Sequence, residues 1–169
     1  MPETPMMRLA IKAALSVVFL CLANATIAQQ SCWARDYSDA HLAKHPDQVV
    51  RQMVVLFEGQ ADGPGELGQT AGVEVFFRDD PRPWSNGFYC PPDAEGGALC
   101  AIDCDGGAFV VSWRDVDTIL LKTNGFVVGV HCDGEEEPKT RNVSDTGAAE
   151  TVFLLRRTGI DACPADWVQ

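Results

Sequence analysis

The feature that most constrains the fold is a series of short apolar segments that alternate every second residue and are separated by turn-forming residues. Between them there is no run of ten to fifteen residues with helical periodicity, which disfavours a parallel βαβ arrangement. The pattern favours a mainly β chain, folded as a single antiparallel β-sandwich or small β-barrel domain. The expected strands are 49–57, 73–78, 109–113, 118–122, 126–132 and 151–157, with 87–90 and 99–104 as weaker candidates.

The segments between the strands contain few helix signals. A short N-terminal helix is expected over 36–45, because Asp and Ser can cap its start and Pro46 follows its end. One short turn is expected over 164–168. The dipeptide Asn124-Gly125, between two apolar runs, predicts a hairpin. Three polar stretches are expected to be loops: 58–72, 79–87 and 133–150.

The first residues have the composition of an export signal. Arg8 and Lys12 precede an uncharged apolar run of eleven residues, 13–23, and small residues follow it. Eleven residues are fewer than the roughly 20 that a spanning helix needs, so an uncleaved membrane anchor is the less favoured alternative. The sequence predicts a signal peptide over residues 1–28, cleaved after Ala28, or after Ala25 as the alternative, and a secreted or periplasmic domain over 29–169 without a stable membrane anchor.

Cleavage changes the cysteine count. It removes Cys21 from the seven cysteines of the chain and leaves an even number, which indicates a disulfide framework in an exported protein. In an extended segment Cys100 and Cys104 would lie roughly 13 Å apart, too far for a disulfide, so each needs another partner. Of the fifteen full pairings that six cysteines allow, we expect Cys32–Cys163, Cys90–Cys100 and Cys104–Cys132. A thiolate metal site is the competing interpretation.

The charge balance excludes some partners. The chain has 13 basic and 24 acidic residues and a net charge of −11, which becomes −12 when Glu3, Arg8 and Lys12 leave with the signal peptide. Binding to nucleic acid requires a basic patch, and attraction to an anionic membrane surface requires clustered lysine and arginine. An acidic chain of this kind is expected to bind neither.

Two segments bring potential metal ligands together. If Cys104 pairs with Cys132, then Asp103, Asp105, His131 and Asp133 gather at one end of the sheet, where they could bind a divalent cation. The alternative is that these residues form ordinary turns, in which Asp accepts local hydrogen bonds and the following Gly takes a positive φ. The calcium-loop pattern also fails, because Gly107 occupies a ligand position.

Other candidate residues are isolated. His41 and His45 are four residues apart and share a helix face, which suits either a metal or a purely structural role. Trp84 lies among turn-forming residues and is a candidate contact for a partner, or a cover for the end of a barrel, whereas Trp113 and Trp167 are expected in the core or at its rim. No nucleophile elbow and no phosphate-binding glycine loop occurs, so no catalytic residue is predicted.

These observations favour a non-catalytic binding or structural domain, secreted or periplasmic, whose ligand is an unknown protein, glycan or small molecule. One alternative is a divalent-metal-binding protein or metal-dependent enzyme that uses the four residues of the Asp103–Asp133 cluster. Another alternative is an inhibitor of an extracellular enzyme.

Overall fold

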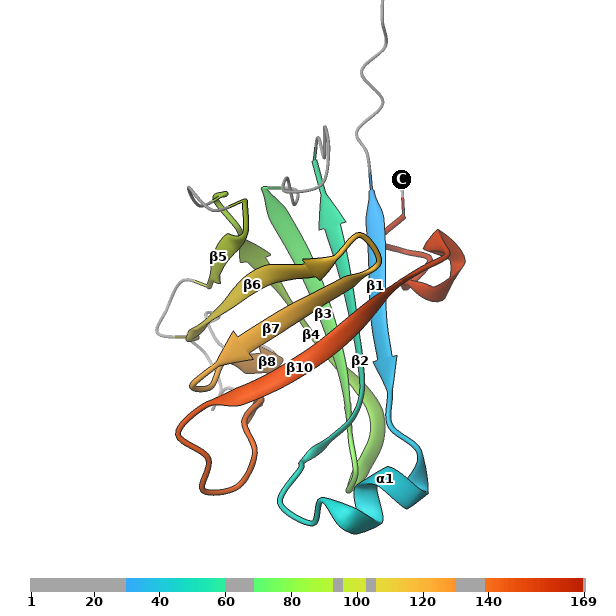
Figure 1. Ribbon diagram of the computed structural model, residues 1–169, viewed down its shortest axis with the longest axis vertical. Helices are drawn as coiled ribbons and strands as arrows, with labels where there is room; N and C mark the ends of the chain where they lie inside the picture. The colour runs from blue at the N-terminus through green and yellow to red at the C-terminus, as the bar shows by residue number, and fades with distance from the viewer. Residues whose placement is uncertain (1–29, 60–68, 93–95, 103–105, 130–138, 169) are drawn as a thin grey trace, which may run out of the picture.

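The computed structural model describes residues 30–59, 69–92, 96–102, 106–129 and 139–168. Within these ranges eight strands close into an antiparallel barrel, and two further strands form a separate hairpin (Figure 1). The barrel strands are β1 (Ser31–Asp36), β2 (Val50–Glu58), β3 (Thr70–Phe77), β4 (Asp80–Tyr89), β5 (Ala98–Ala101), β6 (Ala108–Asp115), β7 (Thr118–Thr123) and β10 (Thr151–Thr158).

The strands follow one another around the barrel almost in sequence order. The order is β1-β2-β3-β4-β5-β6-β7-β10, with β10 pairing back to β1, and every neighbouring pair is antiparallel. In Figure 1, β6, β7 and β10 form a front layer whose strands cross those of β2, β3 and β4 behind. Such a meander is what short strands with polar connections produce when no crossover helix is present.

The hairpin lies between β7 and β10 in the chain. Its strands are β8 (Val127–Gly129) and β9 (Thr140–Asn142), and β8 lies against β4. Phe126 and Val128 are buried in the core, because the hairpin fills one end of the barrel. The expected loop 133–150 therefore contains a strand.

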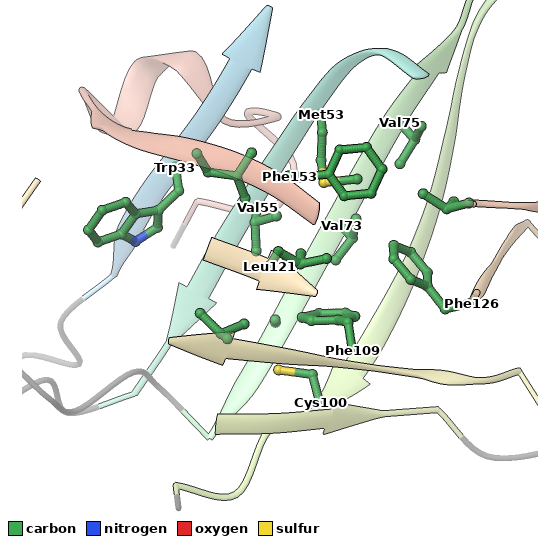
Figure 2. Packing of buried hydrophobic residues seen from close by; sticks show 14 of the residues in the cluster. Trp33, Met53, Val55, Val73, Val75, Cys100, Phe109, Leu121, Phe126 and Phe153 are labelled. Atoms are coloured by element: carbon green, nitrogen blue, oxygen red, sulfur yellow. The ribbon is translucent and has the colours of Figure 1, made fainter. Parts of the chain in front are cut away.

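The core occupies the barrel interior. Along β3 burial alternates, with Ala71, Val73, Val75 and Phe77 facing inward, as the two-residue period of a strand requires. Figure 2 shows side chains from many strands meeting there, including those of Trp33, Phe109 and Phe153, which are at most 1% exposed. An eight-stranded barrel is just wide enough to be filled by side chains or to hold one small ligand, and this one is filled.

One helix joins β1 to β2. It is α1 (Asp39–Lys44), and Ser38 caps it with a side-chain oxygen that accepts a hydrogen bond from the His41 backbone N–H at 3.3 Å. The sequence placed a helix first, over 36–45, but β1 precedes it and includes residue 36. The other helical element is the 3₁₀ turn η2 (Ile160–Ala162), and none of the helices in the described residues is both long and apolar enough to cross a membrane.

Two of the three expected disulfides lie within the described residues. Cys32 is bonded to Cys163, and Cys90 is bonded to Cys100. The third expected pair, Cys104–Cys132, lies outside the described residues. Disulfide bonds are compatible with an oxidising compartment.

The Cys90–Cys100 disulfide lies where the barrel is most weakly paired. In the part of the chain that the structure describes, β4 shares a single register pair with β5, Tyr89 with Ala101, and one isolated bridge joins Pro92 to Ala98. Both sulfur-bearing residues are fully buried, so the bond joins β4 to β5 from the inside.

The prediction of a loop over 79–87 is wrong, because most of these residues belong to β4. Pro81 and Pro83 argued against a strand, since proline cannot donate a hydrogen bond to a neighbouring strand. Within the described residues, β4 pairs along its length with β3, and its other edge meets β5 at one position, so this strand tolerates proline as an edge strand does.

The hairpin predicted at Asn124-Gly125 is also wrong. Both edges of β7 are already paired, with β6 and with β10, so the segment after Gly125 has no free edge of β7 to return to. Gly125 instead has φ of 127° and donates its N–H to the Thr123 hydroxyl at 2.8 Å, and the chain turns into the barrel end.

We expect the two disulfides to stabilise the fold in different ways. Replacing Cys90 and Cys100 by alanine should lower the free energy of unfolding by about 3 kcal/mol, because the two cysteines are ten residues apart in the chain. It should also speed hydrogen exchange in β5, which has few other bonds to β4. The matched control is alanine at Cys32 and Cys163, whose separation of 131 residues predicts a larger loss, about 5 kcal/mol, without selective exchange in β5. Denaturant titration and exchange measurements test this, and equal exchange in β5 of both variants would contradict it.

Candidate functional site

Buried side chains of the described residues occupy the barrel interior, and the candidate site lies on the outside of the barrel. A groove with a volume of about 560 Å³ lies on the outer face of β2, β3 and β4, beside the C-terminal segment. That volume is within the range of ligand sites in proteins. The residues along it are Leu56, Glu58, Thr70, Ala71, Gly72, Ser85, Asn86, Gly87, Phe88, Tyr89, Asp166 and Trp167.

Strand register explains why a hollow forms here. Across β2, β3 and β4, the central row of outward residues is Leu56, Gly72 and Gly87. Two adjacent glycines leave the middle of the wall without side chains. A Cβ built at Gly87 has no neighbouring atom within 4 Å, so the floor of the groove is open at this residue.

At Gly72 the space is already taken by Trp167. A Cβ at this residue would lie 2.8 Å from Cε3 of the Trp167 ring, which is closer than real contacts allow. The absence of a side chain at Gly72 therefore lets the indole lie directly on the β3 backbone. The ring forms one wall of the groove, and the open floor at Gly87 is next to it.

The C-terminal segment is held against this wall by several contacts. The Cys32–Cys163 bond anchors its start. Within the segment, the Trp167 backbone N–H donates to the Pro164 carbonyl at 3.0 Å. Val54 and Leu56 face outward from β2 and are nevertheless buried, because Cys163, Trp167 and Val168 pack over them. This covering explains why the β2 sequence is apolar on both faces.

Carboxylates flank the glycine row on both sides. One neighbouring row contains Glu58, Thr70 and Tyr89, and the other contains Glu74 opposite Ser85. The Gln30 side-chain amide donates to Glu58 at 3.0 Å and to the Trp167 carbonyl at 3.3 Å, so it joins the end of β2 to the C-terminal segment.

Glu74 is a carboxylate whose environment disfavours its charge. Burial raises the pKa of Glu74 above its ordinary value, and the negative charge of Asp166 raises it further. Both causes favour the protonated form, so at neutral pH the charged Glu74 costs folding free energy.

The lower end of the barrel holds a second polar cluster, which includes Trp84. The Trp84 indole N–H donates to Asp80 at 3.1 Å, and Arg82 donates to both oxygens of the same carboxylate. These hydrogen bonds, those from Arg82 first, hold the pKa of Asp80 well below its usual range. Trp84 is half-buried against the core and its polar atom is bonded, so the structure gives it a packing role. Its role as a partner contact stays a prediction.

The two histidines of α1 contact each other. Their rings stack at 4.3 Å, the His41 ring also stacks on Tyr37, and His41 Nε2 lies 3.0 Å from the Gln48 side-chain oxygen. The two therefore share a face, as predicted. In the described part of the chain no group of three or more histidine, cysteine or acidic side chains is arranged to hold a metal ion.

The predicted metal cluster lies outside the described residues. This applies to Asp103, Asp105, His131 and Asp133 alike, and they stay a prediction. The described residues beside the two segments do meet, since the Val127 N–H donates to the Gly106 carbonyl at 2.8 Å.

Sequence reasoning did not identify the groove. Trp167 was expected in the core or at its rim, whereas it lies on the outer wall of the barrel. The sequence holds one signal that points to this arrangement: Val54 and Leu56 are apolar at positions where a half-buried strand has polar residues, so something must cover them.

Comparison of the chain with models of protein families, with curated proteins and with solved structures finds no match. The groove is therefore interpreted from its own residues.

The two glycines allow a matched test of the groove geometry. Gly72→Ala should lower the free energy of unfolding by about 1–3 kcal/mol, because the new methyl group overlaps the Trp167 ring. Gly87→Ala should leave it unchanged or raise it by up to about 1 kcal/mol, because the site is open and alanine restricts the unfolded chain. Denaturant titration of both variants is the measurement, and equal losses at the two positions would contradict the geometry.

The raised pKa of Glu74 predicts a pH-dependent stability. Glu74 binds its proton more tightly in the folded than in the unfolded state. The folding free energy lost through its charged form, its penalty, is therefore fully present above the folded pKa. The penalty disappears as the pH falls through that pKa toward the unfolded value. Glu74→Gln should therefore raise the Tm at pH 7, and the gain should shrink toward pH 4.5. Glu150→Gln, at an exposed carboxylate away from the groove, is the charge-matched control. An equal gain in both variants at every pH would refute the assignment.

Proposed function

We propose that this chain is a secreted or periplasmic, non-catalytic binding domain that holds its ligand in the groove outside β2, β3 and β4. The observation that carries the proposal is the row formed by Gly72 and Gly87, which opens the barrel wall beside Trp167. A filled barrel gives a rigid support, and a rigid support lowers the cost of ordering a binding surface.

The side chains along the groove support binding rather than catalysis. They supply aromatic rings and carboxylates, and in the described part of the groove they include no histidine, cysteine or lysine. Histidine is the commonest general base in enzymes and the usual group that activates a serine, so Ser85 has no such partner among the described groove residues. The apolar leader over 1–28 and the disulfides support an exported location.

Two other functions predicted from the sequence stay predictions. An inhibitor of an extracellular enzyme would be a special case of this proposal, in which the partner is the enzyme itself. A divalent-metal site at Asp103, Asp105, His131 and Asp133 is independent of the groove, and elemental analysis of the untagged protein tests it.

A displayed library of random peptides tests the binding proposal without assuming a ligand. Peptides enriched on the exported protein should lose binding to Gly87→Tyr. The new ring extends into the open floor of the groove, and tyrosine suits a strand. Val110→Tyr is the matched control, because Val110 is exposed on β6, in the other layer of the barrel, and receives the same side chain. Enriched peptides that bind both variants equally would contradict the proposal, as would turnover by the purified protein on a panel of hydrolase substrates.

A further inference from the structure

We propose that the groove receives an arginine side chain from an extended segment of a partner polypeptide. The inference rests on the proposed function and adds the chemical class of the ligand. It follows from the charge of the groove, the shape of its floor and its aromatic wall.

The charge of the groove is negative, and the described residues that line it include no lysine, arginine or histidine. Glu58 and Asp166 line it, and Glu74 lies in the adjoining row. The salt bridges among the described residues involve Asp39, Asp79 and Asp80 and none of these three carboxylates. In the sequence, residues 58–77 contain no lysine, arginine or histidine. A cation from outside would therefore meet acidic groups that have no counter-ion among the described residues.

The positions of the acids define where that cation would lie. Glu58 and Glu74 stand in the rows on either side of the glycine row, and Asp166 comes from the C-terminal segment. A positive charge over the glycine row would thus be approached by carboxylates from different elements. It would also relieve the repulsion between Glu74 and Asp166, which the unliganded groove must tolerate.

The floor and the wall favour the planar guanidinium of arginine over a lysine ammonium. At Gly87 a flat group can lie close to the β4 backbone, since no side chain covers it. Trp167 forms the adjacent wall, and Tyr89, at 61% exposure, stands at the end of the groove. Guanidinium groups stack on aromatic rings and bind carboxylates through two parallel hydrogen bonds, which an ammonium cannot do.

The size of the groove indicates a peptide rather than a free amine. A volume of about 560 Å³ in an open hollow across three strands holds more than one side chain. The arginine stem would lie over the glycine row and against the Trp167 ring while its head reaches the acids. Residues flanking the arginine would then occupy the rest of the groove.

Defined peptides test this assignment. The probes are capped Gly-Ser-Arg-Ser-Gly and the same peptide with citrulline, which has the shape of arginine without its charge, or with lysine. Amide and indole signals of Gly72, Gly87 and Trp167 in two-dimensional NMR spectra report occupancy of the groove. The arginine peptide should shift these signals saturably. We expect affinity at least tenfold weaker for citrulline and severalfold weaker for lysine.

Variants of the exported protein supply the matched controls. Glu58→Gln and Asp166→Asn should each weaken the arginine peptide severalfold, whereas Glu150→Gln, which removes the same charge elsewhere, should not. Raising the salt concentration from 50 to 300 mM should weaken binding as well, because it screens exposed charges.

The outcomes separate this inference from the binding proposal. Equal binding of the citrulline or lysine peptide, or unchanged binding by the Glu58 and Asp166 variants, would overturn the arginine assignment. The arginine assignment would also fall if the arginine peptide caused no shifts at the groove while library peptides without arginine bound there and lost binding to Gly87→Tyr. That result would leave the binding proposal standing. If neither the defined peptides nor the library peptides use the groove, both fall.

Discussion

Closure of the barrel depends on how β4 is held to β5. Among the described residues, seven of the eight neighbouring strand pairs share several register positions, whereas β4 and β5 share one. The buried Cys90–Cys100 bond lies between that register pair and the bridge of Pro92 with Ala98, and β8 packs against β4. Without closure the sheet would have an open edge and an exposed apolar face, so the filled core depends on this junction.

The same closure decides which surface is available to a ligand. The core side chains occupy the interior, so the outer wall is the surface that a ligand can reach. On this wall the size of the side chains differs from one row of paired residues to the next. On β2, β3 and β4, one row lacks side chains at two adjacent residues, and the C-terminal segment lies beside it. The Cys32–Cys163 bond fixes that segment to the wall beside the groove, whereas the Cys90–Cys100 bond is buried in the core.

Much of the architecture could be predicted from the sequence, because it depends on local alternation and on composition. The antiparallel β class follows from two-residue periodicity, and the pairs Cys32–Cys163 and Cys90–Cys100 were among those expected. The errors at 79–87 and at Asn124-Gly125 share one cause: each depends on which strand edges are already occupied. Pro83 is tolerated in β4 because one edge is largely unpaired, and Asn124-Gly125 forms no hairpin with β7 because both edges of β7 are used.

The groove could not be predicted for a related reason. Gly72 and Gly87 are fifteen residues apart in the chain, and only the register of β3 against β4 makes them neighbours. Trp167 is farther still along the chain and reaches Gly72 through a disulfide whose partner is in β1. A sequence pattern shows which residues of one strand share a face. It does not show which residues of neighbouring strands are paired with one another.

Stability and binding make opposite demands on this wall. A side chain at Gly87 would strengthen β4, and a neutral residue at Glu74 would remove a charge that burial and Asp166 disfavour. At the lower end of the barrel, by contrast, Asp79 and Asp80 are paired with Arg141 and Arg82. The acidity of the chain is therefore balanced locally at one end and left without a counter-ion at the groove, within the described residues. Departures from the rules for a stable strand are common at functional sites, and the open floor at Gly87 and the disfavoured charge of Glu74 therefore support the proposed binding site.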